Sequence, residues 1–147
     1  MFKVSYRKPI AFCCGAFLVF LSGCGAEDGA VKQVTVYPVK GSVALADGKP
    51  LKGGKVYFVP KDGALTSEGK IGPDGTFTLE TGGSGAGAPA GEYKVRVEPE
   101  DTSLLAGKKA AKGKTLPFAT KYLDEDSSTL TATVKADPNQ LEPFRLK

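Results

Sequence analysis

Strict alternation of apolar and charged residues from Glu92 to Glu98 is the feature that most constrains the fold of this chain. Tyr93, Val95 and Val97 each stand between two charged neighbours. Successive side chains of a strand point to opposite faces, so the segment is predicted to be a strand with one buried and one solvated face. No stretch shows a convincing helical period, and the chain is therefore predicted to be all-β.

Other segments have a similar β-rich or alternating character, and turn motifs separate them. The further predicted strands are Val34–Val43, Lys55–Val59, Thr76–Glu80, Thr129–Lys135 and Phe144–Leu146. The predicted turns, rich in Asp, Gly and Pro, are Ala46–Pro50, Gly72–Gly75 and Asp137–Asn139. Short strands at this spacing predict a single seven-stranded antiparallel β-sandwich, with six to eight strands as the accepted range.

The N-terminal segment has the parts of a bacterial export signal. Lys3, Arg7 and Lys8 supply positive charge, and an apolar run from Ile10 to Leu21 follows. This run is too short to cross a bilayer comfortably. It ends in the sequence Leu-Ser-Gly-Cys at residues 21–24, which resembles the lipobox of bacterial lipoproteins. The alternative is an ordinary signal peptide or short anchor with a chance Cys at its end.

The lipobox resemblance implies cleavage between Gly23 and Cys24 and acylation of the Cys24 thiol, with palmitate as the expected lipid. Cys13 and Cys14 lie in the removed segment, so the mature chain is expected to form no internal disulfide. Gly25 follows the lipidated position in place of an Asp, which favours the outer membrane. The expected location is the cell envelope, with the domain on the periplasmic or external side of a membrane.

Three parts of the chain are therefore expected. Residues 1–23 are the lipoprotein signal peptide, residues 24–33 are the lipidated Cys and a flexible tether, and residues 34–147 are the β-sandwich domain. The full chain has 20 Lys and Arg against 16 Asp and Glu. Three of the basic residues lie in the signal, which leaves 17 against 16. This near-neutral balance gives no support for binding to nucleic acid.

Composition narrows the chemistry further. The chain has no His, which excludes a His general base, a Ser-His-Asp triad and a His-ligated zinc site. The one Cys of the mature chain is expected to carry lipid, so a Cys nucleophile is excluded as well. The chain is predicted to be no enzyme and to hold neither a cofactor nor a metal.

Motifs across most of residues 39–147 fit one pattern. They are Val39–Val43, Asp47–Pro60, Asp74–Leu79, Gly87–Val95, Lys121–Tyr122 and Ser127–Leu130. Together they resemble carboxypeptidase regulatory-like domains, which are transthyretin-like sandwiches close in architecture to the B repeats of bacterial adhesins. The resemblance implies a transthyretin-like or Ig-like sandwich in a small bacterial lipoprotein. It implies no activity, and no peptidase residue is carried over.

Tyr57 and Tyr122 are candidate ligand contacts, because tyrosine rings can stack on sugars. Tyr93 alternates with charged residues and is expected to point inward. Core packing is the alternative for both candidates, and the chain has no Trp to form a broader aromatic platform.

Other motifs have simpler explanations. Gly113–Thr115 resembles the end of a phosphate-binding loop but lacks the preceding Gly at the required spacing. Asp124–Asp126 is interpreted as a solvated acidic turn in preference to a calcium site. Four lysines in the predicted loop 99–120 could contact anionic head groups or glycans, although a solvated loop is favoured; they are Lys108, Lys109, Lys112 and Lys114.

Two further segments also have a structural explanation that is favoured over a functional one. Thr81–Gly91 is rich in Gly and Ala and is interpreted as a connection between strands, in preference to a ligand-binding loop. Lys40 and Asn139 could form the isopeptide bond found in some adhesin repeats, but a turn-capping role for Asn139 is favoured.

Two functional hypotheses of different class remain. The favoured one is a lipid-anchored, non-enzymatic envelope β-sandwich that acts as a structural or protein-interaction module. The alternative is a carbohydrate-binding module at the cell envelope. The expected partners are the membrane, through the lipid on Cys24, and an envelope protein or glycan whose identity the sequence does not specify. An exposed aromatic pair on one sheet face would favour sugar binding, whereas an open edge strand would favour pairing with a protein.

Overall fold

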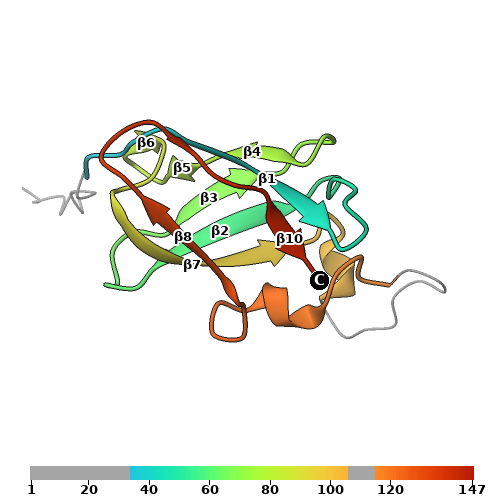
Figure 1. The fold of residues 1–147 in the computed structure, drawn as a ribbon. Coiled ribbons are helices and arrows are strands. Elements are labelled where there is room, and N and C mark those ends of the chain that lie inside the picture. Colours follow the sequence, from blue (N-terminus) through green and yellow to red (C-terminus); the bar gives the residue numbers. More distant parts are fainter. Residues whose placement is uncertain (1–33, 106–114) are drawn as a thin grey trace, which may run out of the picture. The chain divides into compact units, whose positions relative to one another are not determined.

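The computed structural model describes residues 34–105 and 115–147, and these residues form two β-sheets packed face to face (Figure 1). The all-β sandwich predicted from the sequence is thereby confirmed. Several of the features considered above lie outside the described residues. They are the predicted signal peptide 1–23 and tether 24–33, with the cleavage and lipidation site at Gly23 and Cys24, the lysines at positions 108–114, and most of the Gly113–Thr115 motif.

The larger sheet contains six strands in the order β6-β5-β3-β2-β7-β8, and every neighbouring pair in it is antiparallel. The strands β3 and β2 lie at its centre, and β7 separates β2 from the edge strand β8. The six strands are β2 (Lys55–Pro60), β3 (Ser67–Lys70), β5 (Glu80–Thr81), β6 (Gly85–Ala86), β7 (Gly91–Glu98) and β8 (Leu130–Val134).

The smaller sheet is built around one central strand. Its members are β1 (Val39–Leu45), β4 (Thr76–Thr78), β9 (Asn139–Gln140) and β10 (Phe144–Leu146). The strand β4 pairs with β1 antiparallel, but β9 and β10 pair with it parallel. The sandwich is therefore not wholly antiparallel, because the chain crosses from β8 into the other sheet and then runs in the direction of β1. Two short 3₁₀ helices, η1 (Thr102–Leu104) and η2 (Thr120–Leu123), complete the fold.

The strand boundaries differ from expectation in several places. The predicted strand Thr76–Glu80 is divided, because Thr76–Thr78 forms β4 of the smaller sheet while Glu80 begins β5 of the larger one. The first strand begins at Val39, where Val34 was predicted, because Pro38 has no N–H to donate to a ladder; before it only Tyr37 forms a bridge, with Ala88. The strand β3 was not predicted. Of the ten strands in the described residues, seven have at least three residues, and β5, β6 and β9 have two each.

The core between the sheets is organised around Phe58, which is fully buried on β2. Its ring centroid lies 6.0 Å from that of Phe77, 5.8 Å from that of Tyr93 and 6.0 Å from that of Phe144. Phe77 and Phe144 belong to the smaller sheet, so one side chain joins both layers. Tilted and edge-on ring pairs at these separations stabilise the core beyond the burial of their area. Tyr93 points inward as predicted and is 1% exposed.

Gly41 explains how the large Phe77 ring fits against the central strand of the smaller sheet. A Cβ atom at this position would lie 2.5 Å from the end of the Phe77 ring, and Gly41 is directly opposite Phe77 in the ladder. Real carbon atoms do not approach that closely, so the ring occupies space that any larger residue would fill.

A buried pair of hydroxyl groups fixes the junction between β3 and β5. Ser67 is 0% and Thr81 2% exposed, and their side-chain oxygens are 2.8 Å apart. Thr81 donates its single hydroxyl hydrogen to the carbonyl of Gly87 at 2.8 Å. The hydrogen between the two side chains must therefore come from Ser67. Thr81 both accepts and donates here, and in this way connects β3 to the chain that follows β6.

Replacing Thr81 with Val is expected to lower the free energy of unfolding by about 2 kcal/mol or more. The change leaves the Ser67 hydroxyl and the Gly87 carbonyl buried without partners, at about 1–3 kcal/mol for each group. Thr81→Ser is the matched control, since it keeps both hydrogen bonds and removes one methyl group, for a loss of about 1 kcal/mol. Urea unfolding curves of the two variants provide the measurement, and equal losses would contradict this account of the hydroxyl pair.

Candidate interaction surface

The outer face of the larger sheet carries the one sequence-predicted ligand contact that remains accessible, Tyr57 on β2. The guanidinium carbon of Arg96 lies 3.9 Å from the centre of its ring, and the two residues are directly opposite each other in the ladder between β2 and β7. The Tyr57 hydroxyl donates to Glu98 at 3.1 Å. Partial burial, followed by this hydrogen bond to a carboxylate, raises the pKa of the Tyr57 phenol.

Arg96 connects this tyrosine to an acidic turn elsewhere in the chain. Its guanidinium forms ion pairs with Glu98 and, at 3.5 Å, with Glu125. The neighbouring Asp126 pairs with Lys94 of the same strand at 2.8 Å. Turn 124–126 is thus held to the outer face of β7 by two basic side chains. The hydrogen bond and charge attraction between Lys94 and Asp126 lower the pKa of the Asp126 carboxyl and raise that of Lys94.

A shallow groove of about 720 Å³ lies beside Tyr57 on this face. Tyr57, Arg96, Glu68 and Glu80 are among the side chains that line it, and the remainder is largely the Gly-rich connection from Gly82 to Ala86. The Thr81–Gly91 segment connects strands through the hairpin of β5 and β6, as favoured from the sequence, and residues within Gly82–Ala86 also form one wall of this groove.

Tyr122 does not join this surface. It is 2% exposed, belongs to the hydrophobic core, and accepts a hydrogen bond from the Lys147 N–H at 3.0 Å. The core-packing alternative therefore holds for Tyr122, and the expectation of an exposed aromatic pair on one sheet face is not met by Tyr57 and Tyr122. The sequence around the two tyrosines gave no signal that Tyr122 would be buried and Tyr57 half-exposed.

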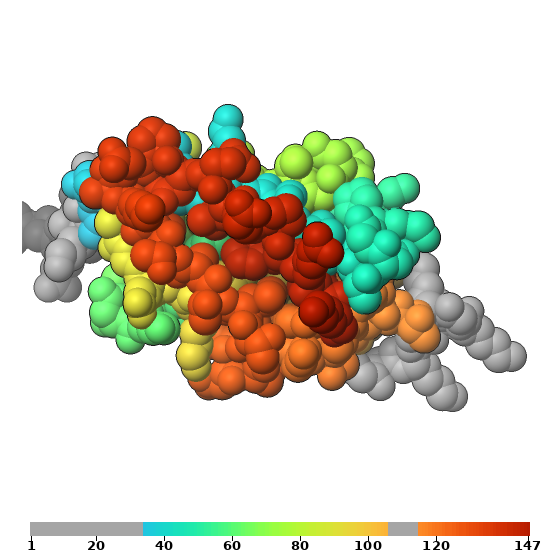
Figure 2. Space-filling model, in the orientation of Figure 1, coloured from blue at the N-terminus to red at the C-terminus, as the bar shows by residue number. Residues whose placement is uncertain are grey.

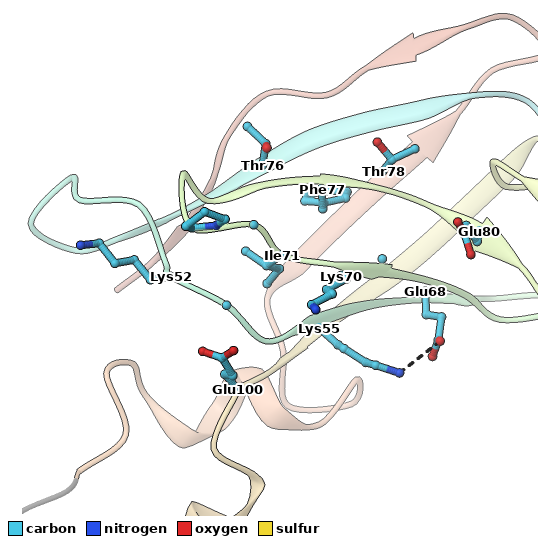
Figure 3. Close-up of a pocket in the computed structure, with 14 residues that line it drawn as sticks. Lys52, Lys55, Glu68, Lys70, Ile71, Thr76, Phe77, Thr78, Glu80 and Glu100 are labelled. Carbon is cyan, nitrogen blue, oxygen red and sulfur yellow. Dashed lines mark hydrogen bonds and ion pairs between the residues drawn. The ribbon is translucent and has the colours of Figure 1, made fainter.

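A second cleft, of about 590 Å³, is lined by residues of β3 and β4 and of the segments that flank them (Figure 3). Phe77 and Ile71 line its apolar floor, and Lys70 and Thr78 lie on opposite strands beside it. Its rim carries both signs of charge, including the ion pair of Lys55 with Glu68 at 3.2 Å. Mixed charge of this kind does not select a ligand of one sign.

The outer edge of β8 is the longest open sheet edge in the described part of the chain. Its orientation follows from one contact, in which the Lys61 N–H donates to the Glu92 carbonyl at 3.2 Å. Backbone groups of a strand alternate in direction, so those of Tyr93 and Val95 on β7 point toward β8. Their partners in the ladder are Ala132 and Leu130.

The backbone groups of the intervening residues, Thr131 and Thr133, must then point away from the sheet. Both residues are exposed, and no described strand pairs with this side of β8. Within β8, residues 130–134 read Leu-Thr-Ala-Thr-Val, with no charge and no Pro. Edge strands usually carry a charged residue or a Pro that prevents pairing with another chain. Because β8 has neither, its edge is unprotected.

The other sheet edges in the described residues are shorter or occupied. The strand β6 has two residues, one of them a Gly. On β4, Thr76 donates its N–H to Asp74 at 3.1 Å and accepts at its carbonyl from Gly72 at 2.8 Å. Beyond β10, the N–H of Lys147 is bound to Tyr122. Only β8 therefore presents several free backbone groups in a row. In Figure 2, residues 115–147, coloured orange to red, form much of the surface in view.

The remaining sequence candidates are placed as follows. The Asp124 carboxylate accepts from the N–H groups of Asp126 and Ser127, as expected of a solvated turn. Within the described residues no group of three or more acidic, His or Cys side chains could hold a metal ion. The side chain of Asn139 closes its own turn through Lys135, which is the capping role favoured above, while Lys40 is exposed.

Comparison with known proteins adds no relative. No protein-family model, curated protein or solved structure matches this chain. Among the described residues, no helix is long and apolar enough to cross a membrane.

The contact between Lys94 and Asp126 is expected to make stability depend on pH. The pKa of Asp126 is lower in the folded protein, so its contribution is present above the unfolded value of about 3.9 and is lost as pH falls through the folded value. Thermal unfolding should therefore show Asp126→Asn less stable than wild type near pH 7 and equal to it near pH 2. Glu142→Gln, which alters an exposed carboxylate outside this contact, is the control. A deficit in Asp126→Asn that stays constant with pH would contradict the ion-pair explanation.

Proposed function

We propose that this protein is a lipid-anchored, non-enzymatic module of the bacterial cell envelope that binds protein through the open edge of β8. The single observation that carries the proposal is the orientation of Thr131 and Thr133, whose backbone groups face outward along an uncharged strand. Addition of a strand to such an edge uses the same backbone hydrogen bonds that hold the sheet together.

The sequence supports the anchored and non-enzymatic parts of the proposal. The Leu-Ser-Gly-Cys motif resembles a lipobox and supports attachment of the mature chain through Cys24, with the outer membrane favoured. The absence of His from the whole chain removes the commonest general base. The strand and turn motifs support membership of the carboxypeptidase regulatory-like lipoproteins, a transthyretin-like group.

Carbohydrate binding is a second candidate function, and one observation favours it. The 720 Å³ groove brings the half-exposed Tyr57 together with two carboxylates and Arg96, which are groups that bind sugar rings and hydroxyls. However, Arg96 lies over the Tyr57 ring and Tyr122 is buried, so this face offers one aromatic side chain where stacking sites commonly use a broader platform. Protein binding through the β8 edge is therefore favoured over carbohydrate binding in this groove.

A photo-crosslinking side chain at position 131 is expected to attach the full-length protein to another polypeptide in the intact envelope. Thr131 is exposed on the open edge, whereas Thr76 is an exposed Thr whose backbone groups are already bonded, so the same crosslinker at position 76 is the matched control. Irradiated cells are compared by electrophoresis and mass spectrometry. Absence of any protein adduct at 131, or equal adducts at both positions, would rule out the edge as the binding surface.

Binding of the intact protein to an array of envelope and extracellular glycans tests the alternative. On the β8 proposal we expect no saturable binding. Saturable binding that Tyr57→Ala abolishes would favour the sugar site. Lys52→Ala, an exposed residue outside the groove, is the control variant.

A further inference from the structure

We propose that the strand which pairs with the β8 edge is β8 of a second copy of this chain, in antiparallel orientation about a two-fold axis at Ala132. This inference rests on the proposed function and names its partner. The two larger sheets would then become one continuous sheet across both copies.

The backbone supports this register. Thr131 and Thr133 present outward-facing N–H and C=O groups, while those of Ala132 point toward β7. In antiparallel pairing about Ala132, Thr131 of each copy lies opposite Thr133 of the other, and each such pair can exchange two hydrogen bonds. Ala132 then lies opposite itself in a pair without hydrogen bonds, where the two strands approach most closely. The small Ala side chain suits that position.

The side chains of β8 are compatible with the same arrangement. Thr131 and Thr133 are exposed and share one face, so each would meet a threonine across the two-fold axis. Cross-strand pairs of threonines are favourable in antiparallel sheets. No charged residue lies within Leu130–Val134, so like charges would not meet along the paired strands.

Charges at the two ends of the strand select an antiparallel second copy. The acidic turn 124–126 precedes β8, and the exposed Lys135 follows it directly. Asp126 and Glu125 already pair with Lys94 and Arg96 of the same copy, so the charge that the turn can offer to a second copy comes mainly from Asp124. Antiparallel pairing about Ala132 places Lys135 of each copy opposite Thr129 of the other, on the side of its acidic turn. Parallel pairing would instead bring the two acidic turns together and the two lysines together. The strand is therefore complementary in charge to an inverted copy of itself.

Disulfide trapping in the full-length protein tests the register. Ala132→Cys puts two thiols at the two-fold axis, where Cα atoms of opposed residues lie about 4.5 Å apart, within the range of a disulfide. Thr133→Cys is the matched control, because its side chain is more exposed but would lie at least about 7 Å from its own counterpart. Both variants are expressed in envelope membranes, mildly oxidised and separated by non-reducing electrophoresis.

We expect the disulfide-linked dimer to form at least about tenfold faster in Ala132→Cys than in Thr133→Cys, because a disulfide requires Cα atoms within about 7 Å. Random collisions would give the reverse order, since position 133 is the more accessible. Equal rates, or faster linkage at 133, would overturn the proposal. Both variants must give wild-type unfolding curves, so that linkage through misfolded protein is distinguished from pairing.

A charge reversal tests the complementarity of the strand ends. Adding Lys135→Glu to Ala132→Cys should lower the dimer yield roughly two- to thirtyfold, the range expected for losing two exposed charge attractions. Lys70→Glu, an exposed lysine on β3, is the control and should leave the yield unchanged. Equal yields in both double variants would overturn the role assigned to the charges.

The photo-crosslink at position 131 separates failure of this inference from failure of the proposed function. An adduct of twice the chain's mass that contains only this protein agrees with self-pairing. Adducts with a different polypeptide alone would overturn self-pairing and keep the edge as a binding surface. No protein adduct at all would overturn both.

Discussion

The packing of Phe58 against rings from both sheets is the interaction on which the rest of the structure depends. The three aromatic partners come from β4, β7 and β10, which are far apart in the sequence, so the cluster forms only when both layers are in place. The described residues contain no Cys, so no disulfide among them holds the layers together. Cohesion between the sheets must therefore come from apolar burial, to which this cluster contributes four of the six buried aromatic side chains of the described core.

A sheet built in this way still has edges, and the fold treats them differently. At one edge, the backbone groups of Thr76 are hydrogen-bonded to Asp74 and Gly72. At another, the edge strand β6 is only two residues long. The strand β8 has no comparable protection. An uncharged open edge of five residues carries a risk of uncontrolled association, which a natural protein usually avoids. An open edge on β8 is consistent with a strand that pairs with a specific partner, provided that the flanking charges restrict which strand can pair with it.

Much of the fold could be predicted because the inward positions of β7, β4 and β10 hold apolar residues that alternate with polar ones, and because β2 is rich in residues that favour strands. The strand β3 could not, since its inward positions are Ser67 and Gly69. Their small size has a structural cause: Ser67 satisfies Thr81, and a Cβ on Gly69 would lie 2.8 Å from the Thr78 carbonyl oxygen. The parallel pairing of β10 also had no local signal, because strand direction depends on the path of the chain between the sheets.

The candidate surface was harder to predict than the fold, for a related reason. Hydrophobic alternation shows which face of a strand is buried, but does not show which strand lies at the edge of a sheet. The residues Thr131 and Thr133 read as ordinary outward positions until the pairing of β7 with β8 shows that their backbone is free as well. Tyr57 and Tyr122 illustrate the converse. Both were reasonable ligand contacts by residue type, and burial alone separates a core side chain from one that lines a groove. The free edge of β8 is thus a property of the sheet topology, and side-chain patterns in the sequence do not show it.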